Sequence, residues 1–138
     1  PHPLCDQIGY ISPANEKKHA AYVNQLNDWT ESEYSHPMLK PILTYVKGGT
    51  ILSDLAQSGI ANPAEKDTVR WTVIGADDED SENCWQNRKL FEAFIGYYSA
   101  KKAEDDQVLC MITGQTTAQA HQHLKGIISI KACRDVDA

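Results

Sequence analysis

A broad apolar stripe between Trp85 and Tyr98 restricts the fold of this chain more than any other feature of its sequence. Apolar residues recur there every three or four positions, which is the spacing of one face of an α-helix. Such a wide apolar face must pack against other elements. We therefore expect a core helix that Ser81 caps and that runs to about Ala100. The carboxylates of Asp77 to Asp80 precede this helix and favour its positive N-terminal end. The stripe consists of Trp85, Leu90, Phe91, Phe94, Ile95 and Tyr98.

Strand patterns are short and lie mostly in the second half of the chain. Apolar and polar residues alternate from Thr68 to Ile74, which predicts a strand with one covered face. Residues 108–112 predict a buried strand, 115–126 a loop, and 127–130 a third strand. The opening stretch 4–11 is interpreted as a strand or an entry turn. The covered positions of the clearest strand are Val69, Trp71 and Val73.

Helical patterns fill the first half. Ser12-Pro13 is typical of a helix start, and we expect that helix to reach about Trp29. A second helix follows Ser35-His36-Pro37 and ends at Gly48-Gly49, and Pro41 either delays its start or distorts it. Thr50 begins a short helix to Gln57. The predicted fold class is therefore α+β: a helical first half followed by a small β-sheet with a packed amphipathic helix, all within one domain.

Charge restricts the ligands that this chain can bind. It holds 13 basic and 19 acidic residues, a net charge of −6, whereas free-standing nucleic-acid binders are usually basic. The stretch from Gln107 to Arg134 nevertheless contains no carboxylate and includes Lys125 and Lys131. We expect any polyanion to lie at this end, because the acidic middle of the chain repels phosphate. Ordinary variation of surface charge is the alternative.

Enzyme and metal motifs are weak. His121 and His123 could share a metal from one side of a strand, with Cys110 as a third ligand, but no fourth ligand is indicated. The alternative is that Cys110 is a small buried hydrophobic residue, as its apolar neighbours indicate. The sequence has no nucleophile elbow, P-loop, dinucleotide fingerprint or zinc-protease motif, so we expect neither catalysis nor a cofactor. Structural zinc is not indicated, because no two of the cysteines are closely spaced; they are Cys5, Cys84, Cys110 and Cys133.

One stretch near the C-terminal end resembles a known family. Leu109-Cys110-Met111-Ile112-Thr113-Gly114, followed by Ala120, His123 and Lys125, is similar to the large subunit, the signature protein, of type I-C CRISPR Cascade complexes. That family carries a Cys, two aliphatics and Thr-Gly, then an Ala and a His-Pro-Lys at fixed distances. The spacing agrees here, and Leu124 stands where the family has Pro.

Two further stretches extend the resemblance over nearly the whole chain. Leu4-Cys5-Asp6-Gln7 with Tyr10-Ile11 resembles the family's Leu-x-Asp-Asn-x-x-Tyr-Val segment, with Gln7 in place of Asn. The stretch 90–98 resembles the helix that precedes the family's Cys-x-x-Thr-Gly strand. The chain also opens without Met, so the resemblance implies an internal fragment of the N-terminal region of a larger subunit.

The resemblance implies a non-catalytic part of a cytoplasmic, RNA-guided DNA surveillance complex in antiviral defence. Guide pairing reads the target in such complexes, and the large subunit recognises the short flanking PAM duplex. Its implied partners are other Cascade subunits, guide RNA and double-stranded target DNA, with no membrane. Lys and Arg suit phosphate and an amide suits a base edge, so the candidate nucleic-acid-binding residues are Gln7, His123, Lys125, Lys131 and Arg134.

Two other functions stay open. The first is a protein-interaction module without nucleic-acid contact. The second is a metal-dependent hydrolase that uses His121 and His123.

Overall fold

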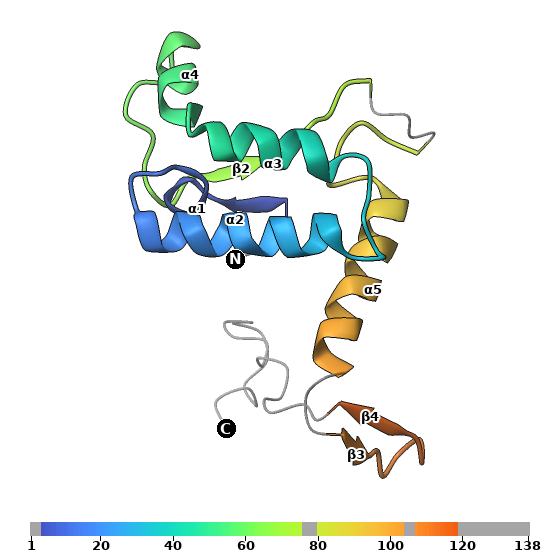
Figure 1. Ribbon diagram of the computed structural model, residues 1–138. Coiled ribbons are helices and arrows are strands. Elements are labelled where there is room, and N and C mark those ends of the chain that lie inside the picture. The colour runs from blue at the N-terminus through green and yellow to red at the C-terminus, as the bar shows by residue number, and fades with distance from the viewer. Residues whose placement is uncertain (1–3, 76–79, 104–106, 119–138) are drawn as a thin grey trace, which may run out of the picture. The chain divides into compact units, whose positions relative to one another are not determined.

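The computed structural model describes residues 4–75, 80–103 and 107–118 (Figure 1). Its fold class is α+β, as predicted from the sequence. The chain divides into two compact units, Pro1–Ala100 and Lys101–Ala138. The elements in chain order are β1 (Cys5–Gln7), α1 (Ile8–Ile11), α2 (Glu16–Glu31), α3 (Leu39–Gly48), α4 (Ile51–Gln57), β2 (Thr68–Arg70), α5 (Arg88–Ala103), β3 (Gln107–Leu109) and β4 (Thr116–Ala118).

The long helix α2 starts later than its sequence suggests. The Asn15 side chain accepts a hydrogen bond from the Lys18 backbone N–H at 3.2 Å and thereby caps the helix. The Ser12 hydroxyl, which lies where the cap was expected, accepts from the Ala14 N–H instead. The predicted apolar stripe is correct, since the buried residues of α2 are Tyr22, Leu26 and Trp29.

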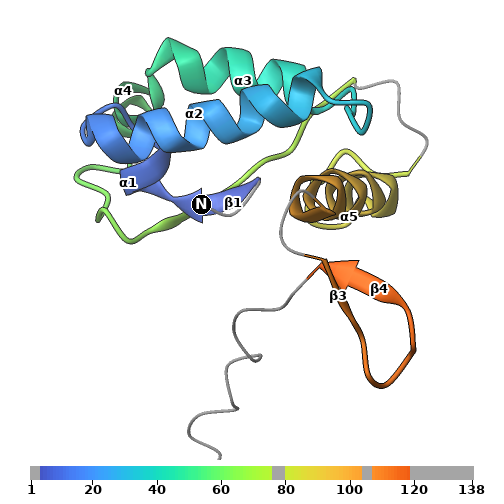
Figure 2. The same cartoon turned by 60° about the horizontal axis from the view of Figure 1, so that its bottom comes forward.

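Helix α3 lies beside α2 in both views (Figures 1 and 2). It begins at Leu39, which places Pro41 in the first turn, where a backbone N–H has no partner within the helix. The predicted late start is thus confirmed. Gly49 ends the helix with φ +67, a left-handed conformation that suits glycine. The short helix α4 then begins directly after Thr50, as predicted.

The strands β1 and β2 form a two-stranded antiparallel ribbon that pairs Cys5 with Arg70 and Gln7 with Thr68. Both strands are shorter than predicted. The first continues as the helical turn α1, and beyond β2 there is only an isolated bridge between Thr72 and Asn83. The predicted alternation holds all the same, and the half-buried side chains that pack on the core are Val69, Trp71 and Val73.

Trp29 lies at the centre of the core and is 1% exposed. Its ring contacts Phe94 edge-on at 5.2 Å and stacks on Tyr97 at 6.0 Å, and both of these residues belong to α5. Its indole N–H donates to the Tyr34 carbonyl oxygen at 2.9 Å. Helices α2 and α5 are therefore joined through one buried indole.

Helix α5 begins at Arg88, so the expected start at Ser81 is wrong. Asn87 caps it: its Oδ1 accepts from the Leu90 N–H at 2.8 Å, while its Nδ2 donates to the Ser81 carbonyl oxygen at 2.9 Å. The predicted carboxylate at the N-terminal end is confirmed for Asp80, which accepts from the backbone N–H groups of Arg88 and Lys89. Asp77 to Glu79 lie outside the described residues.

The apolar stripe of α5 is only half covered. Leu90 and Tyr97 are buried, but Phe91 is 49%, Ile95 63% and Tyr98 50% exposed. The expectation that all of the stripe is core is therefore wrong. The reason is that the apolar residues of α5 occupy a wider arc of the helix than the other elements of the first unit cover.

In the second unit, β3 and β4 form an antiparallel hairpin that pairs Leu109 with Thr116. The predicted turn at Thr113-Gly114 is confirmed, with Gly114 at φ +70. Burial of this strand was expected and is wrong, because Met111 is 91% and Ile112 96% exposed. A two-stranded hairpin has two open faces, and nothing else described in this unit covers them. Residues 116–118, expected in a loop, are strand β4, and the predicted strand 127–130 lies outside the described residues.

Over the ranges that the structure describes, no helix combines the length and the apolar character needed to cross a bilayer.

Candidate nucleic-acid interface

The outward face of the β1–β2 ribbon displays the one predicted binding residue that the structure describes. Gln7 is exposed at the end of β1, where the chain turns directly into α1. Its backbone is extended, with φ −72 and ψ 149, and its N–H donates to Asp6 Oδ1 at 2.7 Å. The Gln7 side chain makes no capping hydrogen bond to α1. Its amide is thus displayed by the strand and is not used to begin the helix.

Arg70 lies diagonally across the ribbon from Gln7. Cross-strand neighbours of this kind are about 7–8 Å apart and face the same side of a ribbon. The Arg70 guanidinium carbon lies 4.7 Å from the centroid of the Trp85 ring, within the range of a cation–π contact. Such stacking uses a face of the guanidinium, whereas its N–H groups donate within its plane. The ribbon therefore presents an oriented cation next to an amide.

A polar clamp fixes the turn on which Gln7 stands. The backbone N–H groups of Ile8 and Gly9 donate to the carbonyl oxygens of Asp67 and Glu65, at 2.9 and 3.0 Å. The Lys18 ammonium donates to the Glu65 carboxylate at 2.5 Å. This hydrogen bond lowers the pKa of Glu65 and raises that of Lys18. Both side chains are solvent-exposed, so the pair orients the loop more than it stabilises the fold.

The underside of the ribbon is anchored in the core. Asp6 faces inward and is 7% exposed, between the outward Cys5 and Gln7. Beneath it, the Trp71 indole N–H lies 3.4 Å from the Tyr22 hydroxyl oxygen. Burial, the main cause, raises the pKa of Tyr22 to about 12. The Tyr22 phenol thus stays neutral and hydrogen-bonded in the core.

A mainly apolar cleft of about 280 Å³ adjoins the ribbon. Cys5 and Trp85 connect it to the ribbon face, and Phe91 connects it to α5. It is lined by Leu4, Cys5, Trp29, Cys84, Trp85, Leu90, Phe91 and Phe94. Burial raises the pKa of the Cys84 thiol to about 11, so this cysteine lines the cleft as an unreactive thiol and not as a nucleophile.

The other predicted binding residues cannot be placed. His123, Lys125, Lys131 and Arg134 lie outside the described residues, and so does His121. Within the ranges that the structure covers, no group of three metal-ligating side chains comes together. Cys110 was expected to be buried and is not, since it is half-exposed at the hairpin turn. The Thr113 hydroxyl is the main cause of a lowered pKa of its thiol.

Sequence reasoning missed Arg70 and Trp85. Arg70 belongs to the polar face of the predicted strand, and a cation in the middle of that face was a usable signal. Its contact with Trp85 was not predictable, because Trp85 was assigned to a helix. The structure instead places Trp85 in the loop before α5, which brings it back to the ribbon through the bridge between Thr72 and Asn83.

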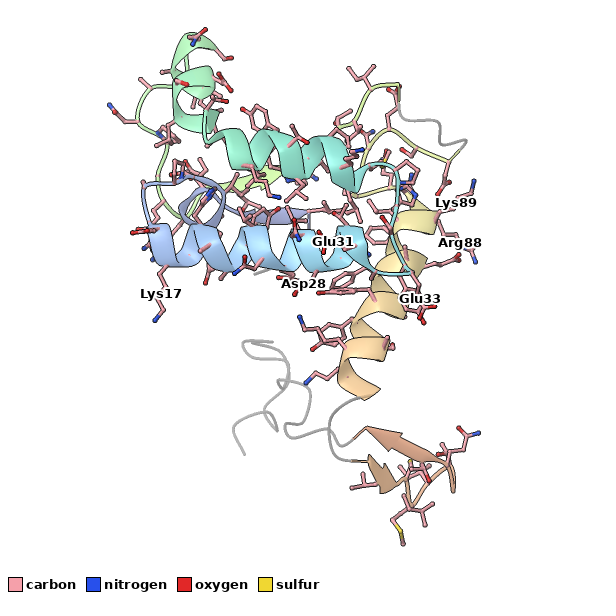
Figure 3. The ribbon with its side chains drawn as sticks, in the orientation of Figure 1. Lys17, Asp28, Glu31, Glu33, Arg88 and Lys89 are labelled. Atoms are coloured by element: carbon pink, nitrogen blue, oxygen red, sulfur yellow. The ribbon has the colours of Figure 1, made fainter. Side chains whose placement is uncertain are left out.

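A larger hollow, of about 840 Å³, opens between α2 and α3. Its polar groups largely satisfy one another. Lys47 donates to the Asn27 oxygen at 2.9 Å, and the Asn27 amide donates to Glu31 at 2.9 Å. Figure 3 shows Asp28, Glu31 and Glu33 along the C-terminal half of α2 and just beyond it, but of these three only Glu31 lines the hollow, together with Lys40 and Lys47.

One of three comparisons with known proteins identifies a family. No curated protein and no solved structure matches the chain significantly. A family model described as CRISPR-associated protein (Cas_Csd1) matches residues 1–134, which is nearly the full length. The match covers both the ribbon that displays Gln7 and the hairpin that carries Cys110. The chain therefore belongs to the Cas_Csd1 family of CRISPR-associated proteins.

Proposed function

We propose that this chain is a non-catalytic, DNA-recognising segment of the large subunit of a type I-C Cascade complex. In this role it contributes to recognition of the PAM and target duplex and contacts neighbouring subunits that hold the guide RNA. Sequence along the target is then read by guide pairing, and the protein reads only the short flanking duplex.

One observation carries the proposal: the outward face of the ribbon combines the Gln7 amide with the Arg70 cation stacked on Trp85. A glutamine amide both donates and accepts, so it matches the edge of a base pair, adenine best. A stacked guanidinium suits phosphate or guanine. The two side chains project from paired strands, so they lie on the same face of the ribbon. The cations predicted in the C-terminal stretch, Lys125, Lys131 and Arg134, would add phosphate contacts.

A protein interface is the second candidate, and the hairpin favours it. Met111 and Ile112 stand almost fully exposed at its turn, next to half-exposed Leu109. Exposed apolar side chains that gather in this way often mark contact with another protein. In a multi-subunit complex the two functions are compatible, with DNA at the ribbon and a subunit at the hairpin.

The test measures duplex binding in the assembled complex, over a series of flanking sequences and salt concentrations. Gln7→Ala should reduce discrimination between flanking sequences by about 1–3 kcal/mol. Gln57→Ala is the matched control, since Gln57 is an exposed glutamine at the end of α4. It should leave discrimination unchanged.

Charge reversal separates phosphate contacts from base contacts. Replacing Lys125, Lys131 and Arg134 by Glu should weaken all duplexes alike and lower the salt slope by about 0.9 for each phosphate that is no longer neutralised. Lys17→Glu is the control, because Figure 3 shows Lys17 projecting from the start of α2. Unchanged affinity, slope and discrimination in all test variants would refute the proposed function.

A further inference from the structure

The apolar cleft beside the ribbon is a feature of the first unit that the proposed duplex contacts do not use. Its volume of about 280 Å³ lies below the range of about 300–1,000 Å³ that small-molecule sites span. It therefore has room for one ring-sized apolar group, and not for a cofactor. Fully buried Trp29 and Leu90 line it together with the more exposed Trp85 and Phe91, so an apolar floor opens to solvent between aromatic rings.

The cleft continues into an apolar surface on α5. Phe91, which lines the cleft, is followed by Ile95 and Tyr98 at spacings of four and three, so the three side chains share one face of the helix. Each of them is about half exposed or more, and they extend over about 10 Å. A pocket bordered by apolar surface is the usual arrangement where a partner protein inserts an anchor side chain. A small ligand would leave this surface uncovered, so the structure favours a polypeptide.

Arg70 lies at the rim of the cleft. It stands directly opposite Cys5 in the ribbon, and side chains so paired share one face with Cβ atoms about 4.5–5.5 Å apart. Cys5 lines the cleft, and so does Trp85, on whose ring the Arg70 guanidinium stacks. Within the part of the chain that the structure describes, no carboxylate pairs with Arg70 and no acceptor receives its N–H groups. The complementary occupant therefore carries a carboxylate close to its apolar group.

We infer that the cleft docks a segment of a partner protein, which inserts one aromatic side chain beside Trp85 and Phe91 and places a neighbouring carboxylate against Arg70. Apolar residues of the segment beyond this anchor cover the apolar surface of α5. The inference rests on the proposed function only for the neighbouring subunit that supplies the segment. A guanidinium has five N–H donors, so a carboxylate on the cleft side leaves donors for a phosphate on the side of Gln7.

The first test measures whether the cleft takes a ring with a carboxylate. The probe is para-fluorophenylpropionate, compared with its neutral amide, and fluorine NMR follows titration of the full chain. The acid should bind with a Kd on the order of a few millimolar, as expected for a fragment of this size, and the amide should bind more weakly. Arg70→Gln should weaken binding of the acid about fivefold and leave the amide unchanged. Lys66→Gln, which removes an exposed cation from the loop before β2, is the matched control.

The second test measures whether a protein covers the cleft in the assembled complex. Cys5 is exposed and lines the cleft, so iodoacetamide should modify it in the isolated chain. In the complex assembled without target DNA, peptide mass spectrometry should show modification slowed at least about tenfold, as expected when over about nine-tenths of the chain is assembled. Cys5→Phe fills the cleft with a ring and should weaken both probe binding and assembly. Thr68→Phe places the same ring on an exposed position of β2 outside the cleft and should change neither.

The outcomes separate the occupants. Equal modification of Cys5 in the isolated chain and in the complex overturns the inference, and so does an acid that binds no better than its amide. Protection that appears only after target duplex is added shows that DNA covers the cleft, and protection of the isolated chain that grows with its concentration shows a second copy. Both results overturn the inference.

The same experiments distinguish this inference from the proposed function. Protection of Cys5 without DNA, together with unchanged duplex binding in every variant of the duplex test, supports the docking site and refutes the proposed function. Reduced discrimination in Gln7→Ala without protection of Cys5 overturns the docking site and leaves the proposed function standing.

Discussion

Replacing Gly96 by alanine tests how α5 is held against the core. An ideal Cβ at Gly96 would lie 2.6 Å from the Tyr34 Cε1 atom, far inside van der Waals contact. Glycine inside a helix is about 1 kcal/mol less favourable than alanine, so the substitution should stabilise the protein if space allows. The overlap with the Tyr34 ring opposes this gain, at a cost of about 1–3 kcal/mol.

The clash should exceed the gain in helix propensity, because the hydrogen bond from the Trp29 indole to the Tyr34 carbonyl oxygen fixes the backbone from which the Tyr34 ring projects. We expect Gly96→Ala to lower the free energy of unfolding by about 1 kcal/mol, or the Tm by roughly 3 °C. In a Tyr34→Ala background the overlap is gone, so the same substitution should raise stability by about 1 kcal/mol. The sign therefore reverses, and the coupling free energy is about 2 kcal/mol.

Urea unfolding followed by tryptophan fluorescence measures the stability of the wild type, the two single variants and the double variant. The buried Trp29 stacks on Tyr97 of α5, so its emission reports whether α5 is docked. Gly96→Ala that stabilises the wild-type background would refute the close approach of Tyr34. Equal destabilisation in both backgrounds would show that the effect arises elsewhere in the helix.

Two further predictions follow from perturbed pKa values. Burial raises the pKa of Tyr22 to about 12, above its value of 10.0 in the unfolded chain, so the folded state binds the proton more tightly. The contribution of Tyr22 to the free energy of unfolding should thus be fully present below pH 10 and should fall by up to ~3 kcal/mol as pH rises towards 12. Tyr22→Phe should remove this part of the alkaline loss of stability, as measured by unfolding curves at a series of pH values. For the cysteines, iodoacetamide at pH 8 followed by peptide mass spectrometry should modify Cys110 readily and leave Cys84 intact. Thr113→Val should slow the reaction of Cys110, and a Cys84 that reacts equally fast would contradict its burial.

The sequence predicts helices better than their ends. The periodic residues of α2 and α3 were assigned to the right faces, and Gly49 was correctly placed at a left-handed turn. The starts were wrong where two side chains compete for the same cap, as with Ser12 and Asn15. Which hydroxyl or amide reaches the free N–H groups depends on the path of the loop, and a local pattern does not contain that path.

Burial was predicted less well, because it depends on what covers an element. Val108 to Ile112 has the composition of a buried strand, yet it stands in a two-stranded hairpin with open faces. Half of the α5 apolar arc is open for a related reason. Composition shows that a segment is able to be buried, and only the arrangement of the other elements decides whether it is.

The contact between Gly96 and Tyr34 also decides which residues α5 exposes. If α5 rotated by a third of a turn about its axis, Phe91 and Ile95 would enter the core and Leu90 and Tyr97 would leave it. Glycine at position 96 lets the Tyr34 ring approach the backbone and thereby fixes the rotation that buries Leu90 and Tyr97. The same packing that stabilises the unit therefore leaves Phe91, Ile95 and Tyr98 open to solvent.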